Sequence, residues 1–166
     1  MTLQPYLAAD TIHALATPTG GALAVVRMSG PRSREILRLL VGGELPTKPR
    51  ELFRAKLRDG NGDPLDDGMA VFFVAPKSHT GEDTVELYLH GGAVVANRAL
   101  ETLGRLGSRQ ALPGEFSFRA VRNGKTTVAE AEAVADLIAA RNEDAARLAL
   151  EKMGGSQAKW VGELAE

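Results

Sequence analysis

Strand-like segments in the first ninety residues place the strongest limits on the fold. The runs ALAVVRMS (22–29) and GMAVFFVAP (68–76) are nearly continuous and apolar, which is typical of strands buried on both faces. By contrast, LFRAKLRD (52–59) and DTVELYLH (83–90) alternate apolar and polar residues, so one face of each is expected to be exposed. A shorter candidate strand, DTIHALAT, covers residues 10–17. These segments predict a domain that contains a β-sheet.

Two helices are predicted between these strands. Residues 29–43 begin with Ser-Gly-Pro, carry an apolar stripe and stop at a Gly-Gly pair, which are ordinary helix start and stop signals. Residues 93–107 follow Gly91-Gly92, and their predicted stripe includes Val94, Val95, Leu100, Leu103 and Leu106. The first part of the chain is therefore expected to be mixed α/β.

The composition changes near residue 125 and becomes rich in alanine and glutamate. Helices are predicted over 126–140, where Thr127 and Glu130 have the spacing of a capping box, and over 142–153. Helical character resumes after 156 and runs to residue 166 without a stop signal, so we expect the natural protein to continue. The predicted domains are 1–124 and 125–166, the second being the first helices of a larger helical domain.

Composition and charge exclude several classes of function. The 166-residue chain has a formal net charge of −1, so it lacks the general basic field of non-specific nucleic-acid binders. It has no cysteine, which excludes disulfides, thiolate metal sites and thiol nucleophiles. Its start does not resemble a signal peptide, and no apolar run approaches membrane-spanning length, so the cytoplasm is the expected location and no membrane partner is expected.

The triplet Gly124-Lys125-Thr126 looks like the end of a phosphate-binding P-loop. That motif requires a glycine where this chain has Arg119, and an apolar strand where it has the polar segment PGEFSFRAVRN. The P-loop interpretation is therefore rejected. The three histidines are scattered and no nucleophile-elbow motif occurs, so no metal ligand and no catalytic residue is assigned.

Arg27, Glu86 and Lys125 are the candidate binding residues. Arg27 interrupts an apolar strand, so its guanidinium requires an anion, either an internal carboxylate or a ligand. Glu86 lies mid-strand beside Tyr88 and is either a solvated face residue or a carboxylate for a ligand's N–H donors. Lys125 precedes a helix start and is either solvated or part of a pocket for a carboxylate or phosphate.

Four stretches together resemble one family. In chain order they are DTIHALATPTGGALAVVRMSGP, SHTGEDTVELYLHGG, LPGEFSFRAVRNGKTTVAEAEAVADLI and EDAARLALEKMGG. They resemble the N-terminal part of the MnmE (TrmE) tRNA-modification GTPases, and the resemblance covers about residues 10–155. HTGEDTVEL, HGG and PGEFS are its most specific stretches.

The resemblance implies an α+β fold. A mixed α/β tetrahydrofolate-binding domain similar to those of aminomethyltransferases is followed by the start of a helical domain. It implies binding of 5-formyl- or 5,10-methylene-tetrahydrofolate, with contacts that map onto Arg27, Glu86 and Lys125. It also implies a homodimer formed through the N-terminal domain. The full-length protein would act with the flavoprotein MnmG (GidA) on the wobble uridine of tRNA.

The chain also departs from the family pattern. The turn TPTGGAL before Arg27 is one residue shorter than usual, and NGKTTVAEAEA replaces the common NDKLDLAQAEA. No GTPase signature follows, so GTP, Mg²⁺ and K⁺ are expected only in a GTPase domain that this sequence does not contain. Two alternatives remain open: a free-standing aminomethyltransferase-like enzyme, or an assembly domain without a ligand.

Overall fold

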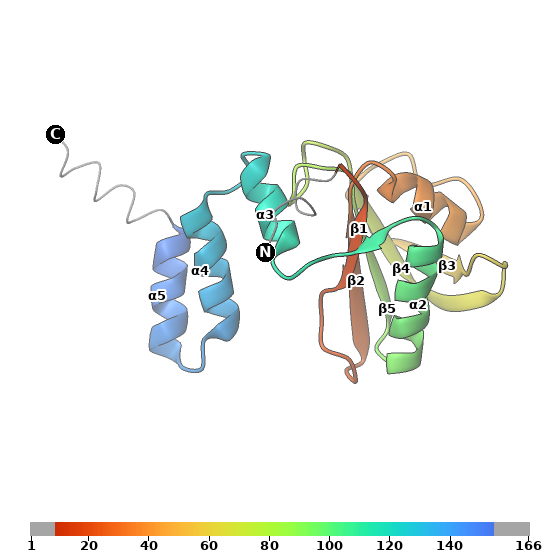
Figure 1. Ribbon diagram of the computed structural model, residues 1–166. Helices are drawn as coiled ribbons and strands as arrows, with labels where there is room; N and C mark the ends of the chain where they lie inside the picture. The colour runs from red at the N-terminus through yellow and green to blue at the C-terminus, as the bar shows by residue number, and fades with distance from the viewer. Residues whose placement is uncertain (1–8, 155–166) are drawn as a thin grey trace. The chain divides into compact units, whose positions relative to one another are not determined.

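The computed structural model describes residues 9–154, which belong to two compact units divided between Arg119 and Ala120 (Figure 1). The division predicted from composition lies between residues 124 and 125. None of the helices in the described range combines the length and hydrophobicity that a bilayer crossing requires.

The first unit is built on a six-stranded sheet with the order β3-β4-β5-β2-β1-β6. Its strands are β1 (Ile12–Leu15), β2 (Leu23–Ser29), β3 (Phe53–Arg58), β4 (Pro64–Phe73), β5 (Thr84–His90) and β6 (Arg109–Gln110). Neighbouring strands are antiparallel except β1 and β6, which are parallel. The strand β5 therefore lies between β4 and β2, which brings two distant parts of the sequence together.

Helices α1 (Ser33–Val41) and α2 (Ala93–Arg105) pack against one face of the sheet (Figure 1). The predicted stripe of α1 is confirmed, since Ile36, Leu37 and Leu40 are buried. The predicted stripe of α2 is wrong at Val94, which is 73% exposed. Helical periodicity instead turns Ala96, Ala99 and Leu103 toward the core, so small residues let α2 approach the sheet closely.

The alternation predicted for β3 and β5 is confirmed, but β2 is not buried on both faces. Ala24, Val26 and Met28 are fully buried toward the helices, whereas Arg27 is half-buried and Leu23 is 59% exposed on the other side. This nearly continuous apolar run therefore forms a strand that is buried on one face only, because apolar side chains such as Leu23 also occupy its partly solvated face.

The HGG stretch after β5 is explained by a close backbone approach. Gly91 donates its N–H to the Ala22 carbonyl at 3.1 Å, and its own carbonyl accepts from the Gly20 N–H at 3.1 Å. A Cβ atom at Gly91 would overlap the Gly21 carbonyl oxygen, so only glycine fits. Gly92 is the N-cap of α2 and has open space around its Cα.

The second unit contains a helical hairpin of α4 (Val128–Ala139) and α5 (Glu143–Met153). The predicted capping box is confirmed: Thr127 Oγ1 accepts from the Glu130 N–H, and the Glu130 carboxylate accepts from the Thr127 N–H. Two large apolar side chains of α4, Val128 and Ile138, are 59% and 82% exposed. The helix predicted over 156–166 lies outside the described residues.

A helix that the sequence did not predict, α3 (Glu115–Arg122), spans the division between the units. It ends in a Schellman motif, in which Lys125 donates its backbone N–H to Ala120 and Gly124 donates to Val121. Gly124 has the positive φ of 65° that this cap requires. The Gly-Lys-Thr triplet thus caps α3 and directly precedes Thr127, the N-cap of α4.

Candidate functional site

Arg27 and Glu86 meet on the face of the sheet opposite α1 and α2, which we call the open face. They are direct cross-strand partners of β2 and β5. Arg27 donates from Nε to Glu86 Oε1 at 2.9 Å, and its Nη2 lies 2.8 Å from the same oxygen. Tyr88 donates its hydroxyl to the other oxygen, Glu86 Oε2, at 2.7 Å. The three side chains form one hydrogen-bonded row, the Arg27–Glu86–Tyr88 row.

The row is partly buried and leaves binding capacity unused. The side chains of Arg27 and Glu86 are 31% and 14% exposed. A carboxylate offers about four acceptor positions and a guanidinium five donors, and the bonds within the row use only part of each. Of the explanations left open by the sequence, an internal partner for Arg27 is confirmed, and this partner is the second candidate residue itself.

Two further groups surround the row. The guanidinium carbon of Arg27 lies 6.0 Å from the centre of the Phe116 ring, at the outer range of a cation–π contact. Burial and the charge of Arg27 lower the pKa of His79, and Glu86 opposes this effect. The hydrogen bond to Glu86 raises the pKa of Tyr88. Aromatic and titratable groups therefore line the region around the two charges.

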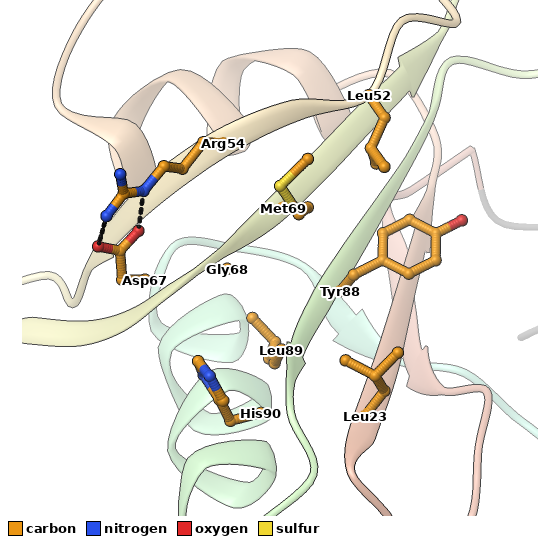
Figure 2. A pocket seen from close by; sticks show the side chains of 9 residues that line it. All are labelled: Leu23, Leu52, Arg54, Asp67, Gly68, Met69, Tyr88, Leu89 and His90. Carbon is orange, nitrogen blue, oxygen red and sulfur yellow. Dashed lines mark hydrogen bonds and ion pairs between the residues drawn. The ribbon is translucent and has the colours of Figure 1, made fainter.

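An apolar hollow of about 350 Å³ adjoins the row on the Tyr88 side (Figure 2). Its lining residues are Leu23, Leu52, Arg54, Asp67, Gly68, Met69, Tyr88, Leu89 and His90. Leu23 and Leu52 remain 59% and 54% exposed. Arg54 and Asp67 form a two-bond ion pair at the rim, with distances of 2.7 and 2.8 Å. The open face thus offers apolar area next to oriented charges.

His90 at the edge of this hollow is held by Asp66. The Asp66 carboxylate accepts from the His90 backbone N–H at 2.9 Å and lies 2.7 Å from its Nδ1. This hydrogen bond raises the pKa of His90. The imidazole itself is largely exposed, so Asp66 orients a ring that solvent can reach.

A second charged cluster fixes the start of α3 to the first unit. Arg119 is fully buried and donates to Asp10 at 2.6 Å, to Glu115 at 3.0 Å and to Glu82 at 3.1 Å. Arg109 joins the cluster through Glu115 at 2.7 Å and Asp10 at 2.8 Å. Burial raises the pKa of Glu115 and Asp10, but hydrogen bonds from the two arginines outweigh it and the pKa of each carboxyl lies below its ordinary value.

The sequence does not predict this cluster, because the segment 113–123 is polar and charged residues are mostly exposed. The available signal was the spacing of Glu115 and Arg119, which is the i, i+4 ion-pair spacing of a helix. Their complete burial depends on Asp10 and Glu82, which lie far away in sequence.

Lys125, the third candidate residue, belongs to the second unit. Its side chain is exposed, and its backbone N–H is used by the Schellman motif at the end of α3. The structure therefore brings two of the three candidates, Arg27 and Glu86, into direct contact within the first unit.

Comparison with known proteins identifies the family. Residues 11–125 match the family model described as GTP-binding protein TrmE N-terminus. A protein of Alkalilimnicola ehrlichii named tRNA modification GTPase MnmE is 49% identical over 159 residues, which cover 95% of this chain and 35% of that protein. Proteins of the same name from Coxiella burnetii and Paramagnetospirillum magneticum are 46% and 49% identical, over 97% and 92% of this chain.

The chain spans about a third of the length of these relatives. The matched region includes β1 to β6, both faces of the sheet and the Arg27–Glu86–Tyr88 row. The chain therefore belongs to the MnmE/TrmE family and carries its N-terminal domain.

Proposed function

We propose that this chain is the folate-binding and dimerisation module of a GTPase that modifies the wobble uridine of tRNA. The observation that supports it most is the Arg27–Glu86–Tyr88 row beside an apolar hollow, in a chain of the MnmE/TrmE family. The first unit would then share its architecture with the folate-binding domains of aminomethyltransferases. The proposed location is the cytoplasm.

The chemistry of the row suits a reduced folate such as 5-formyl- or 5,10-methylene-tetrahydrofolate. A pterin presents adjacent N–H donors, and Glu86 carries a carboxylate whose orientation is already set by Tyr88 and Arg27. Arg27 and Lys125 would hold the acidic tail or a carbonyl oxygen of the ligand. The folate supplies the one-carbon chemistry, and these side chains bind and orient it.

Calorimetric titration with 5-formyltetrahydrofolate tests this proposal. Glu86→Gln should weaken binding by about 1.5–3 kcal/mol, the scale of a hydrogen bond to a charged group. Glu101→Gln is the matched control, because Glu101 is 68% exposed on α2, on the other side of the sheet. Absence of binding at millimolar ligand would contradict the folate proposal, as would equal affinities of the two variants.

Dimerisation is proposed through the first unit. Leu23 and Leu52 are large apolar side chains that remain more than half exposed on the open face, and burial of such area is the usual source of association free energy. Light scattering of the wild-type chain should give twice the protomer mass, and Leu52→Asp should shift it toward the monomer. A wild-type chain that stays monomeric at high concentration would contradict this part of the proposal.

In the full-length protein, MnmG and tRNA are the proposed partners. GTP, Mg²⁺ and K⁺ are assigned to a GTPase domain outside this sequence. These assignments come from the family resemblance, and binding of labelled tRNA to the full-length protein, with and without the flavoprotein, would test them.

A further inference from the structure

We propose that Phe116 is a positioning residue of the candidate site: its ring restrains the Arg27 guanidinium in the orientation that faces Glu86. Its effect on folate affinity rests on the function proposed above, whereas its effect on Arg27 can be measured without any ligand.

The first step of the argument is the freedom that Arg27 would otherwise have. Arginine carries about 2 kcal/mol of rotamer entropy, and the side chain of Arg27 is 31% exposed on the open face. The hydrogen bond from Nε and the ion-pair contact of Nη2 converge on one oxygen, Glu86 Oε1, and not on both carboxylate oxygens. Such an arrangement leaves the guanidinium plane less fixed than a two-oxygen fork would. A second contact to the guanidinium, from another element, would supply the missing restraint.

Phe116 provides that contact. The guanidinium carbon lies 6.0 Å from the centre of its ring, at the outer range of a cation–π interaction. Phe116 comes from α3 whereas Glu86 comes from β5, so the guanidinium is limited from two different elements. A lysine at position 27 could not reproduce this arrangement, because it has a single nitrogen where Arg27 places both Nε and Nη2 against Glu86.

The position of Phe116 is itself fixed by its neighbours in α3. Glu115 and Arg119 are both fully buried, and they bind Arg109, Asp10 and Glu82. These ion pairs flank Phe116 by one residue on one side and three on the other. The backbone that carries Phe116 therefore belongs to a part of the helix that cannot move without exposing or breaking buried charges. Arg27 is therefore contacted by a residue on a helix segment that buried ion pairs fix in place.

The main experiment compares Phe116→Leu, Phe116→Met and Phe116→Tyr. Leucine and methionine keep apolar volume but lack a π face, whereas tyrosine keeps the ring. Phe53→Leu is the matched control, since Phe53 is a half-buried phenylalanine that packs on the core cluster. Thermal melting of all four variants shows whether each one is folded. If Phe116→Leu is not, the effect on Arg27 is measured in Phe116→Met, whose flexible side chain is the better tolerated of the two.

The ligand-free readout is the Nε–H signal of Arg27 in ¹H–¹⁵N NMR spectra, assigned by its disappearance in Arg27→Lys. In the wild-type chain and in Phe116→Tyr this proton should be protected from exchange with water. In Phe116→Leu and Phe116→Met it should shift, because the ring current is lost, and exchange severalfold faster. An Arg27 signal that is the same in Phe116→Met as in Phe53→Leu would overturn the proposal.

The second readout is affinity for 5-formyltetrahydrofolate by calorimetry. Phe116→Leu and Phe116→Met should bind about two- to fivefold more weakly than the wild-type chain, the scale of one exposed cation–π contact, and Phe116→Tyr should recover the affinity. If the wild-type chain binds no folate while the Nε–H signal responds as expected, the proposed function fails and the role of Phe116 toward Arg27 stands. If folate binds and the Phe116 variants match Phe53→Leu in affinity, the role of Phe116 in ligand binding is refuted.

Discussion

Arg27 and Glu86 are each other's partner: they are paired in register across β2 and β5, with Arg27 Nη2 at 2.8 Å from Glu86 Oε1. Two residues that the sequence indicates independently as candidate binding residues thus form one ion pair. A ligand that binds Glu86 or Arg27 must either use the donor and acceptor positions that remain or replace part of this pair. The interaction free energy of the pair therefore contributes both to the free energy of unfolding and to the free energy of ligand binding.

A double-mutant cycle on this pair should show coupling. Arg27→Met and Glu86→Gln should each lower the free energy of unfolding by about 1 kcal/mol, and the double variant should lose less than the sum, because each single change leaves a half-buried charged or polar partner. Urea denaturation followed by circular dichroism measures the four values. Arg105 and Glu101, 3.9 Å apart and both about two-thirds exposed, form the control cycle, which should be additive. Additivity at Arg27 and Glu86 as well would contradict the coupling.

Arg119→Met should strongly destabilise the first unit. The guanidinium is fully buried and binds three carboxylates, so its removal takes one of the two arginines from a cluster with three carboxylates, at a cost of about 3–5 kcal/mol. Chemical denaturation gives this value. Arg38→Met, at an exposed position of α1, should change stability by less than about 0.5 kcal/mol. A loss below about 1 kcal/mol for Arg119→Met would mean that the cluster does not fix α3.

Gly91→Ala and Gly92→Ala form a matched pair of changes one residue apart. Gly91→Ala should lower the free energy of unfolding by about 1–3 kcal/mol or more, because the new Cβ would overlap the Gly21 carbonyl oxygen. Gly92→Ala meets no atom within 4 Å and has an extended backbone with φ of −67°, so its effect should stay well below that of Gly91→Ala. Thermal melting compares the two, and equal losses would show that the close approach is not what requires glycine.

The sequence predicted most of the sheet and its helices because their signals are local. Alternation in 52–59 and 83–90 fixed the exposed faces of β3 and β5, and the same alternation placed Glu86 on the open face. It could not predict that Glu86 faces Arg27, because that contact depends on β5 lying beside β2, a non-local strand order. The sequence predicts a partner for the Arg27 charge and either a solvated or a ligand-binding role for Glu86, and only the strand order shows that the two side chains pair with each other.

The helix α3, by contrast, is an element that local sequence signals do not predict. A polar segment was not expected to be buried, yet Glu115 and Arg119 are among the largest fully buried side chains of the described residues. Their burial is possible only because Asp10, Glu82 and Arg109 neutralise them, and those partners come from three other segments. Local propensity carries no information about such compensation, so both the helix and the Phe116 contact that it provides had to come from the structure.

Stability should fall on the acid side of neutrality through His13. This residue is buried, and burial lowers its pKa. Ser108 donates its hydroxyl to the Leu103 carbonyl at 2.8 Å, so it accepts from His13 Nδ1 at 2.7 Å, which fixes the neutral Nδ1–H tautomer. The unfolded chain therefore binds more protons than the folded one as pH falls below about 6.5, and the contribution of His13 is complete above that value.

The measurement is the free energy of unfolding between pH 5.5 and 7.5, and His13→Asn should flatten its decline toward low pH. His79, whose pKa is also lowered, acts in the same direction, so the slope should be reduced rather than removed. His90 has the opposite sign: its pKa is raised by Asp66, so its contribution is present below about 6.5 and is lost as pH rises through the raised value. His90→Asn should therefore lower the free energy of unfolding below about pH 6.5 and flatten its decline as pH rises above that value. A His13→Asn profile parallel to that of the wild-type chain would show that neutral His13 does not set the acid limb.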